Sequence, residues 1–136
     1  MLKVLLVDDE PFIVQGLSAL IDWEKEGFEI VGTAGNGSEA VEFLKSNPVD
    51  LILADIKMPV MNGLVFLKYI RETHLSEAFF VILSGYGDFT YAKEAIKWQC
   101  TDYILKPIQK SQLLALLSKV KQMQQDKKEE REMIWR

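Results

Sequence analysis

Charged and hydroxyl side chains recur in this sequence where short apolar runs end. These residues are Asp8 and Asp9, Asp55, Ser84, and Lys106. Several carboxylates at close range repel each other and raise one another's pKa unless a cation lies among them. A hydroxyl and an ammonium suit the oxygens of an incoming phosphoryl group. The residue types therefore indicate phosphoryl chemistry beside a bound cation, provided that the fold brings the five side chains together.

The apolar runs themselves predict the elements that would position these side chains. Apolar residues at helical spacing follow each run, so that five strands alternate with five helices. This alternation is typical of a parallel sheet with helices on both faces, a three-layer α/β sandwich. The carboxyl ends of parallel strands meet at one edge, where ligands bind in such folds. The predicted strands are residues 2–7, 30–34, 51–55, 79–83 and 103–105.

The carboxylates at this edge predict a magnesium site. Hard oxygen ligands with room for water suit Mg²⁺, which one or two carboxylates hold together with phosphate oxygens. Asp55 lies between the acidic and the basic residues, and a carboxylate can act as a nucleophile that forms an acyl phosphate. Asp55 is therefore the predicted phosphoacceptor, with Ser84 and Lys106 contacting the phosphoryl group.

Each of these residues also has a simpler interpretation when it is taken alone. Asp8 or Asp9 could cap the helix that begins near Pro11, and Asp55 could be a turn residue. Ser84 could belong to a plain turn, and Lys106 to an exposed loop. The phosphoryl-site hypothesis rests on finding all of them at the ends of predicted strands.

Composition limits the other classes of function. The 136 residues suit one domain, and the formal net charge of −4 argues against nonspecific DNA binding by this chain. With one cysteine, Cys100, and one histidine, His74, neither an intramolecular disulfide nor a cysteine-rich or multi-histidine metal site is expected. There is no signal-peptide pattern and no apolar run long enough for a membrane span, so a cytoplasmic location is expected.

Four motifs give the chain a specific resemblance. It resembles the receiver domain of bacterial two-component response regulators over roughly residues 2–121. That resemblance implies a flavodoxin-like (βα)5 fold with sheet order 2-1-3-4-5. The matching motifs are residues 7–11, residues 55–59 with 61–63, residues 84–86, and residues 102–107.

The resemblance also implies roles for individual residues. Asp55 would accept a phosphoryl group from a sensor histidine kinase. Asp9 and Asp55 would bind Mg²⁺ with the backbone carbonyl of Lys57, and Asp8 would act partly through water. Ser84 and Lys106 would contact the phosphoryl group. Tyr103 would be a switch residue.

The switch would change a surface that binds a partner. This surface consists of the helix after Asp88, the strand at 103–105 and the helix after Ser111. Phosphorylation would favour a homodimer through it, because added charge at one end biases a two-state element.

The organisation of the chain follows from the same resemblance. Residues 1–121 form the predicted receiver domain, and residues 122–136 a helical extension or linker towards a missing output domain. Residues 83–92 and an insertion at 23–27 resemble the subfamily with AraC-type DNA-binding output domains. Transcriptional control would then be exerted through that output domain, and this chain would contact neither nucleic acid nor membrane directly.

Two alternative functions remain at this stage. One is a magnesium-dependent aspartyl-phosphate hydrolase, although such enzymes usually carry an Asp-x-Asp nucleophile motif that residues 8–10 do not supply. The other is a receiver used as an interaction module without phosphorylation. In the receiver interpretation the chain is not an enzyme beyond assisting its own phosphorylation and dephosphorylation.

Two positions depart from the usual receiver pattern. Gln99 stands where a glycine usually closes the fourth helix, and a left-handed backbone there would cost roughly 1 kcal/mol. Helix ending or packing could therefore differ there. Lys57 places a cation beside the site, where it could tune water attack on the acyl phosphate.

Overall fold

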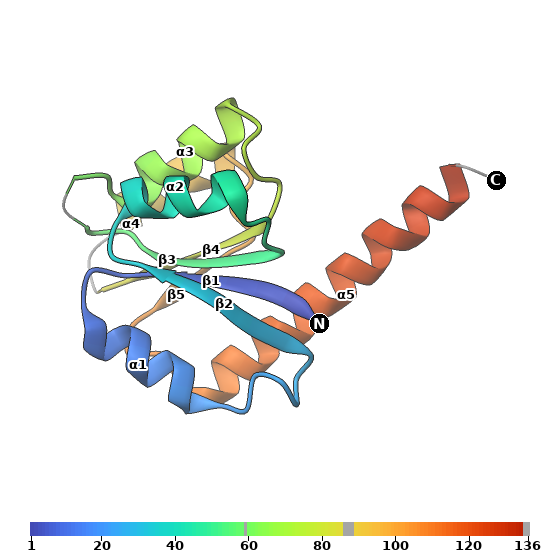
Figure 1. Ribbon diagram of the computed structural model, residues 1–136, viewed down its shortest axis with the longest axis horizontal. Helices are drawn as coiled ribbons and strands as arrows, with labels where there is room; N and C mark the ends of the chain where they lie inside the picture. The colour runs from blue at the N-terminus through green and yellow to red at the C-terminus, as the bar shows by residue number, and fades with distance from the viewer. Residues whose placement is uncertain (59, 86–88, 135–136) are drawn as a thin grey trace.

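The computed structural model describes residues 1–58, 60–85 and 89–134. Five strands and five helices alternate along the chain (Figure 1). The strands are β1 (Leu2–Val7), β2 (Phe28–Ala34), β3 (Leu51–Asp55), β4 (Phe79–Ser84) and β5 (Asp102–Leu105). The helices are α1 (Pro11–Leu20), α2 (Gly37–Ser46), α3 (Gly63–Glu72), α4 (Phe89–Lys97) and α5 (Lys110–Ile134).

The sheet confirms the predicted architecture. All strand pairs are parallel and the order is β2-β1-β3-β4-β5. Helices α2, α3 and α4 cover one face of the sheet, and α1 and α5 cover the other (Figure 1). The three layers of the flavodoxin-like fold are therefore present, and the carboxyl ends of the strands share one edge.

The central strands are apolar because both of their faces are buried. Alternate side chains of β3 enter different clusters: Ile52 lies in the one beneath α2, α3 and α4, and Leu53 lies in the one beneath α1 and α5. Phe66 of α3 packs on Phe80 of β4 with ring centroids 5.5 Å apart. Asp55 ends β3 with almost no solvent exposure, as expected for a buried parallel strand.

Helix starts are where the structure differs most from the sequence predictions. The sequence predicts Ser38 as the N-cap of the second helix, but Asn36 caps α2, and its side chain accepts a hydrogen bond from the backbone N–H of Glu39. The helix therefore starts at Gly37, which lies against Met61: any Cβ there would approach within 2.8 Å of the Met61 carbonyl oxygen. Ser111 lies inside α5, which begins one residue before it. The sequence also predicts Asp88 as the cap of the fourth helix; Asp88 lies outside the described residues, as does Tyr86.

The last helix continues past the sheet without a break (Figure 1). We call residues 122–134 the α5 extension. Met123 packs against the α1/α5 core, and the Lys127 Nζ lies 5.2 Å from the centroid of the Phe79 ring. The extension thus still contacts the domain at the amino-terminal end of β4.

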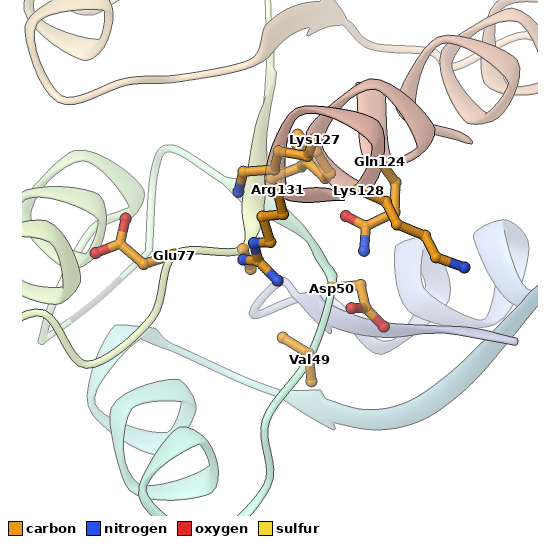
Figure 2. A pocket seen from close by; sticks show the side chains of 9 residues that line it. Val49, Asp50, Glu77, Gln124, Lys127, Lys128 and Arg131 are labelled. Carbon is orange, nitrogen blue, oxygen red and sulfur yellow. The ribbon is translucent and has the colours of Figure 1, made fainter. Parts of the chain in front are cut away.

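A groove of about 460 Å³ separates the α5 extension from that end of the sheet. Figure 2 shows basic side chains of the extension, including Lys128 and Arg131, above Asp50 of the loop preceding β3, with Glu77 of the loop preceding β4 to the left. The groove lies at the opposite end of the strands from Asp55. Among the described helices, none is both long and apolar enough to cross a membrane.

Candidate functional site

Three carboxylates meet at the carboxyl edge of the sheet. Asp8 and Asp9 follow β1, and Asp55 ends the adjacent β3, with Val7 paired to Ala54. One oxygen from each of the three carboxylates lies within 4.8 Å of the others. Asp8 and Asp55 are buried, whereas Asp9 is exposed. The predicted acidic cluster therefore exists, with one member open to solvent.

Lys106, which directly follows the outermost strand β5, completes the cluster at the same carboxyl edge. Its Nζ lies 2.9 Å from the Asp8 carboxylate and 3.4 Å from the Asp55 carboxylate. The backbone N–H of Lys106 donates a 2.7 Å hydrogen bond to the carbonyl of Ser84. Pairing of β4 with β5 thus brings Lys106 to the same edge as Asp55.

The remaining predicted site residues also lie at or near this edge. Ser84 is fully buried, and its Oγ lies 3.4 Å from the carbonyl oxygen of Gly85. Lys57 hydrogen-bonds Asp55 through its backbone, while its side chain is exposed. Tyr103 is half-buried and packs against the core beneath α2, α3 and α4. Capping of α1 is not the role of Asp8, because Glu10 occupies the N-cap and Asp8 instead accepts the Glu10 backbone N–H.

Burial and charge set the protonation of the site. Burial raises the pKa of Asp55, and the nearby Asp8 adds to this, while Lys106 opposes it. Burial alone would lower the pKa of Lys106, but its hydrogen bond to Asp8 and the charges of both carboxylates raise it. Lys106 is therefore a firmly protonated cation that partly neutralises two buried acids.

The loop after Asp55 is held tightly against the site. The Gly63 N–H donates a 3.0 Å hydrogen bond to the carbonyl of Ile56, and a Cβ at Gly63 would collide with the backbone oxygen of Asp55. On the other side of the loop, the Gly37 N–H donates to the Met61 carbonyl. Between these ties Val60 has φ of 70° and is 87% exposed.

Val60 is a feature that sequence reasoning missed. A β-branched residue in the left-handed region is a real outlier, and its type carries no signal of that conformation. The close approach at Gly63 could have been suspected from the Asn62–Gly63 pair, since Asn62 caps α3 by accepting the Val65 N–H.

The donor set fits a hard divalent cation. Carboxylate oxygens are the ligands that Mg²⁺ prefers, and the exposed Asp9 leaves one side open for water and phosphate oxygens. Lys106 neutralises one of the three negative charges of the carboxylates. The charge that remains would attract a divalent cation, and both cations would then attract a phosphoryl group. The site can thus bind a metal and present a carboxylate nucleophile.

Comparison with known proteins places these features in context. Residues 4–118 match the family model described as response regulator receiver domain. The chain is 38% identical to the REC domain of AraT, a response regulator from Geobacillus stearothermophilus, with a TM-score of 0.85 over 93% of this chain and 98% of that one. It is 32% identical to a two component transcriptional regulator AraC from Clostridium phytofermentans, with a TM-score of 0.80 over 90% and 94% of the two chains.

Curated relatives are longer than this chain. It is 39% identical to the uncharacterized transcriptional regulatory protein YesN of Bacillus subtilis, over 88% of this chain and 32% of that protein. It is 37% identical to the transcriptional regulatory protein HptR of Staphylococcus aureus, over 88% of this chain and 46% of that protein. The chain thus spans about a third to nearly half of the length of these two relatives.

Proposed function

This chain belongs to the response regulator receiver domain family, and on that premise we propose that Asp55 accepts a phosphoryl group from a sensor histidine kinase. The observation that carries the proposal is the contact of Lys106 with both Asp8 and Asp55 beside the exposed Asp9. It joins a nucleophile, a fixed cation and a metal-ligand set at one edge of the sheet. In two-component signalling, this step would couple a sensed signal to a phosphorelay output.

The transfer needs an ionised Asp55. One of its carboxylate oxygens forms a bond to phosphorus while the bond from phosphorus to the donor's histidine nitrogen breaks, and the nitrogen keeps the electron pair. Lys106, 3.4 Å from Asp55, would then contact a phosphoryl oxygen. The Ser84 hydroxyl would turn from Gly85 to donate to another oxygen.

Asp8, Asp9 and Asp55, with the backbone carbonyl of Lys57, would hold Mg²⁺. The bound ion would neutralise the charge that builds up between the carboxylate and the phosphoryl oxygens. Asp9 is the exposed member of the set, so it is the ligand through which the ion would enter.

Phosphorylation would change how the face formed by α4, β5 and α5 binds a partner. Ile96 of α4 is 72% exposed, and Leu105 of the edge strand β5 is 37% exposed, so apolar side chains are available to a second copy. Tyr103 of β5 packs against the core beneath α2, α3 and α4 and would act as the switch residue. A phosphorylation-dependent homodimer through this face is the expected output.

The relatives that extend beyond this chain support a transcriptional role. Residues 1–121 would be the receiver, and residues 122–136 would lead to an output domain that binds DNA, of the AraC type. This chain would then act in the cytoplasm, without direct nucleic-acid or membrane contact. Its own chemistry would be limited to gaining and losing the phosphoryl group.

Labelling with acetyl phosphate and Mg²⁺ tests the phosphoacceptor. Wild type should gain one acid-stable, base-labile phosphoryl group, and Asp55→Asn should gain none. Asp50→Asn is a matched control in the loop just before the same strand, at the opposite end from Asp55, and should label like wild type. Equal labelling of Asp55→Asn would overturn the assignment.

The same samples separate the alternative functions. Sustained release of phosphate from a phosphate ester would favour a hydrolase. An absence of labelling in wild type would favour an interaction module. Size-exclusion chromatography with and without beryllofluoride tests the homodimer, which would be rejected if the elution did not change.

A further inference from the structure

Arg71 joins three segments of the chain through backbone carbonyls. From α3, its Nη1 donates to Ser76 at 2.8 Å and its Nη2 to Ala78 at 2.7 Å, both in the loop before β4. Its Nε donates to Trp98 at 3.2 Å and its Nη2 also to Gln99 at 3.3 Å, both just after α4. One planar side chain therefore links the end of α4 to the start of β4.

The segment that Arg71 binds is the carboxyl-terminal cap of α4. Gln99 has φ of 62°, the left-handed conformation that commonly ends helices. The Cys100 N–H donates to the Ala95 carbonyl and the Gln99 N–H to the Ile96 carbonyl, which closes the last turn. Helix α4 thus ends in the left-handed conformation that glycine usually adopts at this position, although the residue here is Gln99.

A cation suits this position because the carboxyl end of a helix carries partial negative charge. The carbonyls of Trp98 and Gln99 directly follow such an end, and they accept hydrogen bonds from the half-buried, delocalised guanidinium of Arg71. Burial lowers the pKa of Arg71, and the nearby Glu77 and Cys100 oppose this. Lys68, one turn earlier on α3, lies 5.6 Å from the Trp98 ring centroid but contacts the ring rather than the carbonyls.

We propose that Arg71 is a positioning residue that fixes the carboxyl-terminal end of α4, so that this helix moves about that end when Asp55 is phosphorylated. The anchoring itself holds in the unphosphorylated protein, whereas the movement rests on the proposed function. Only four residues separate Ser84 from Phe89, the first residue of α4. A movement of Ser84 towards the phosphoryl group would therefore act first on the amino-terminal end of α4. The fixed end would convert that change into a tilt.

Amide hydrogen exchange tests the anchor in the unphosphorylated protein. Arg71→Met should speed exchange at residues 98–100 by about tenfold or more, because several hydrogen bonds from a charged group are lost there. Lys68→Met, the matched control, should change these amides by about twofold at most. An unchanged rate in Arg71→Met, or an equal rise in Lys68→Met, would overturn the proposal.

Arg71→Lys keeps the test valid if Arg71→Met does not fold. An ammonium offers its three donors from a single atom and cannot reach all the carbonyls that lie around the edges of the planar guanidinium. Faster exchange at residues 98–100 is therefore still expected, with the rest of the domain unchanged. Wild-type rates in Arg71→Lys would show that charge alone suffices and would remove the positioning role.

Beryllofluoride with Mg²⁺ tests the movement. In wild type it should change exchange in residues 89–94 and leave residues 98–100 within about twofold of their unbound rates. In Arg71→Lys the change should extend to residues 98–100. Equal changes at both ends in wild type would reject a fixed end. No response anywhere would reject the proposed switch, while the comparison of unphosphorylated variants would still decide the anchor.

Discussion

Lys106 lies 2.9 Å from the Asp8 carboxylate, across 98 residues of sequence. The same ammonium is 3.4 Å from Asp55, so one cation contacts both buried acids of the site. Breaking such a pair by removing one partner leaves an uncompensated buried charge. The geometry therefore explains how two acids remain side by side before any phosphoryl group arrives.

Magnesium should stabilise the folded domain. A ligand that binds only the native state raises the free energy of unfolding by about 2.7 kcal/mol at about 100 times its dissociation constant. We expect a magnesium-dependent rise in the urea midpoint of wild type. Asp9→Asn should lose most of this rise while keeping its stability in EDTA, since Asp9 is exposed. Equal stabilisation of Asp9→Asn would place the ion elsewhere.

Replacing Asp55 by asparagine should stabilise the domain in the absence of metal. Burial raises the pKa of Asp55, so the native state binds a proton more tightly than the unfolded chain, and the ionised form costs stability near neutral pH. Asp55→Asn removes this cost, and Lys106 keeps Asp8 as its partner at 2.9 Å, so the variant should gain of order 1 kcal/mol at about pH 7.

Acidification is the control for that prediction. As the pH falls through the raised pKa, Asp55 becomes protonated and wild type recovers the lost stability, so its difference from Asp55→Asn should shrink. Urea unfolding in EDTA at about pH 7 and about pH 5 measures both values. A gap that widens on acidification would contradict the direction of the shift.

Gly63→Ala should damage the site through the backbone. The added Cβ would meet the Asp55 carbonyl oxygen, and it would lie 3.0 Å from the Ile56 Cα, so the backbone itself must shift. We expect a loss of about 1–3 kcal/mol and slower labelling by acetyl phosphate.

Gly16→Ala is the matched control for Gly63→Ala. A Cβ added at Gly16, an exposed residue inside α1, would have no neighbouring side chain or distant backbone atom within 4 Å. Alanine there should stabilise the domain by about 0.5–1 kcal/mol without changing labelling. Similar effects of both substitutions would show that the close approach at Gly63 is unimportant.

Val60→Asn should stabilise the domain by about 1 kcal/mol, because asparagine tolerates the left-handed conformation that Val60 adopts at φ of 70°. Little burial is lost, since Val60 is 87% exposed. Thermal or urea unfolding measures the gain. Val65→Asn, an exposed position in α3 with helical backbone, should give no gain and separates strain relief from a general effect of polarity.

The sequence was most informative where reactive side chains stand at the carboxyl ends of parallel strands. Asp8, Asp55 and Lys106 each end a strand or follow one directly, and parallel strands bring such positions to one edge, so their proximity could be predicted without an alignment. The sheet order came from the family resemblance and agrees with the structure. The assignments of individual roles stay predictions until labelling is done.

Other contacts had no sequence signal. The partners of Arg71 are backbone carbonyls, and every residue has one, so residue types could not identify them. The sequence predicted Ser38 as the cap of the second helix, whereas Asn36 is the cap and Gly37 after it lies against Met61. Such tertiary contacts depend on how loops meet in space.

Because α5 is one continuous helix, a small rotation at its start would produce a larger displacement at its end. Its 25 residues correspond to a rod of about 37 Å that begins shortly after Lys106 and ends beyond the far side of the sheet. A rigid rotation of about 5° at its first turn would displace its last turn by about 3 Å. The Lys127 Nζ lies 5.2 Å from the centroid of the Phe79 ring, so this contact would have to shift whenever the helix rotated relative to the sheet.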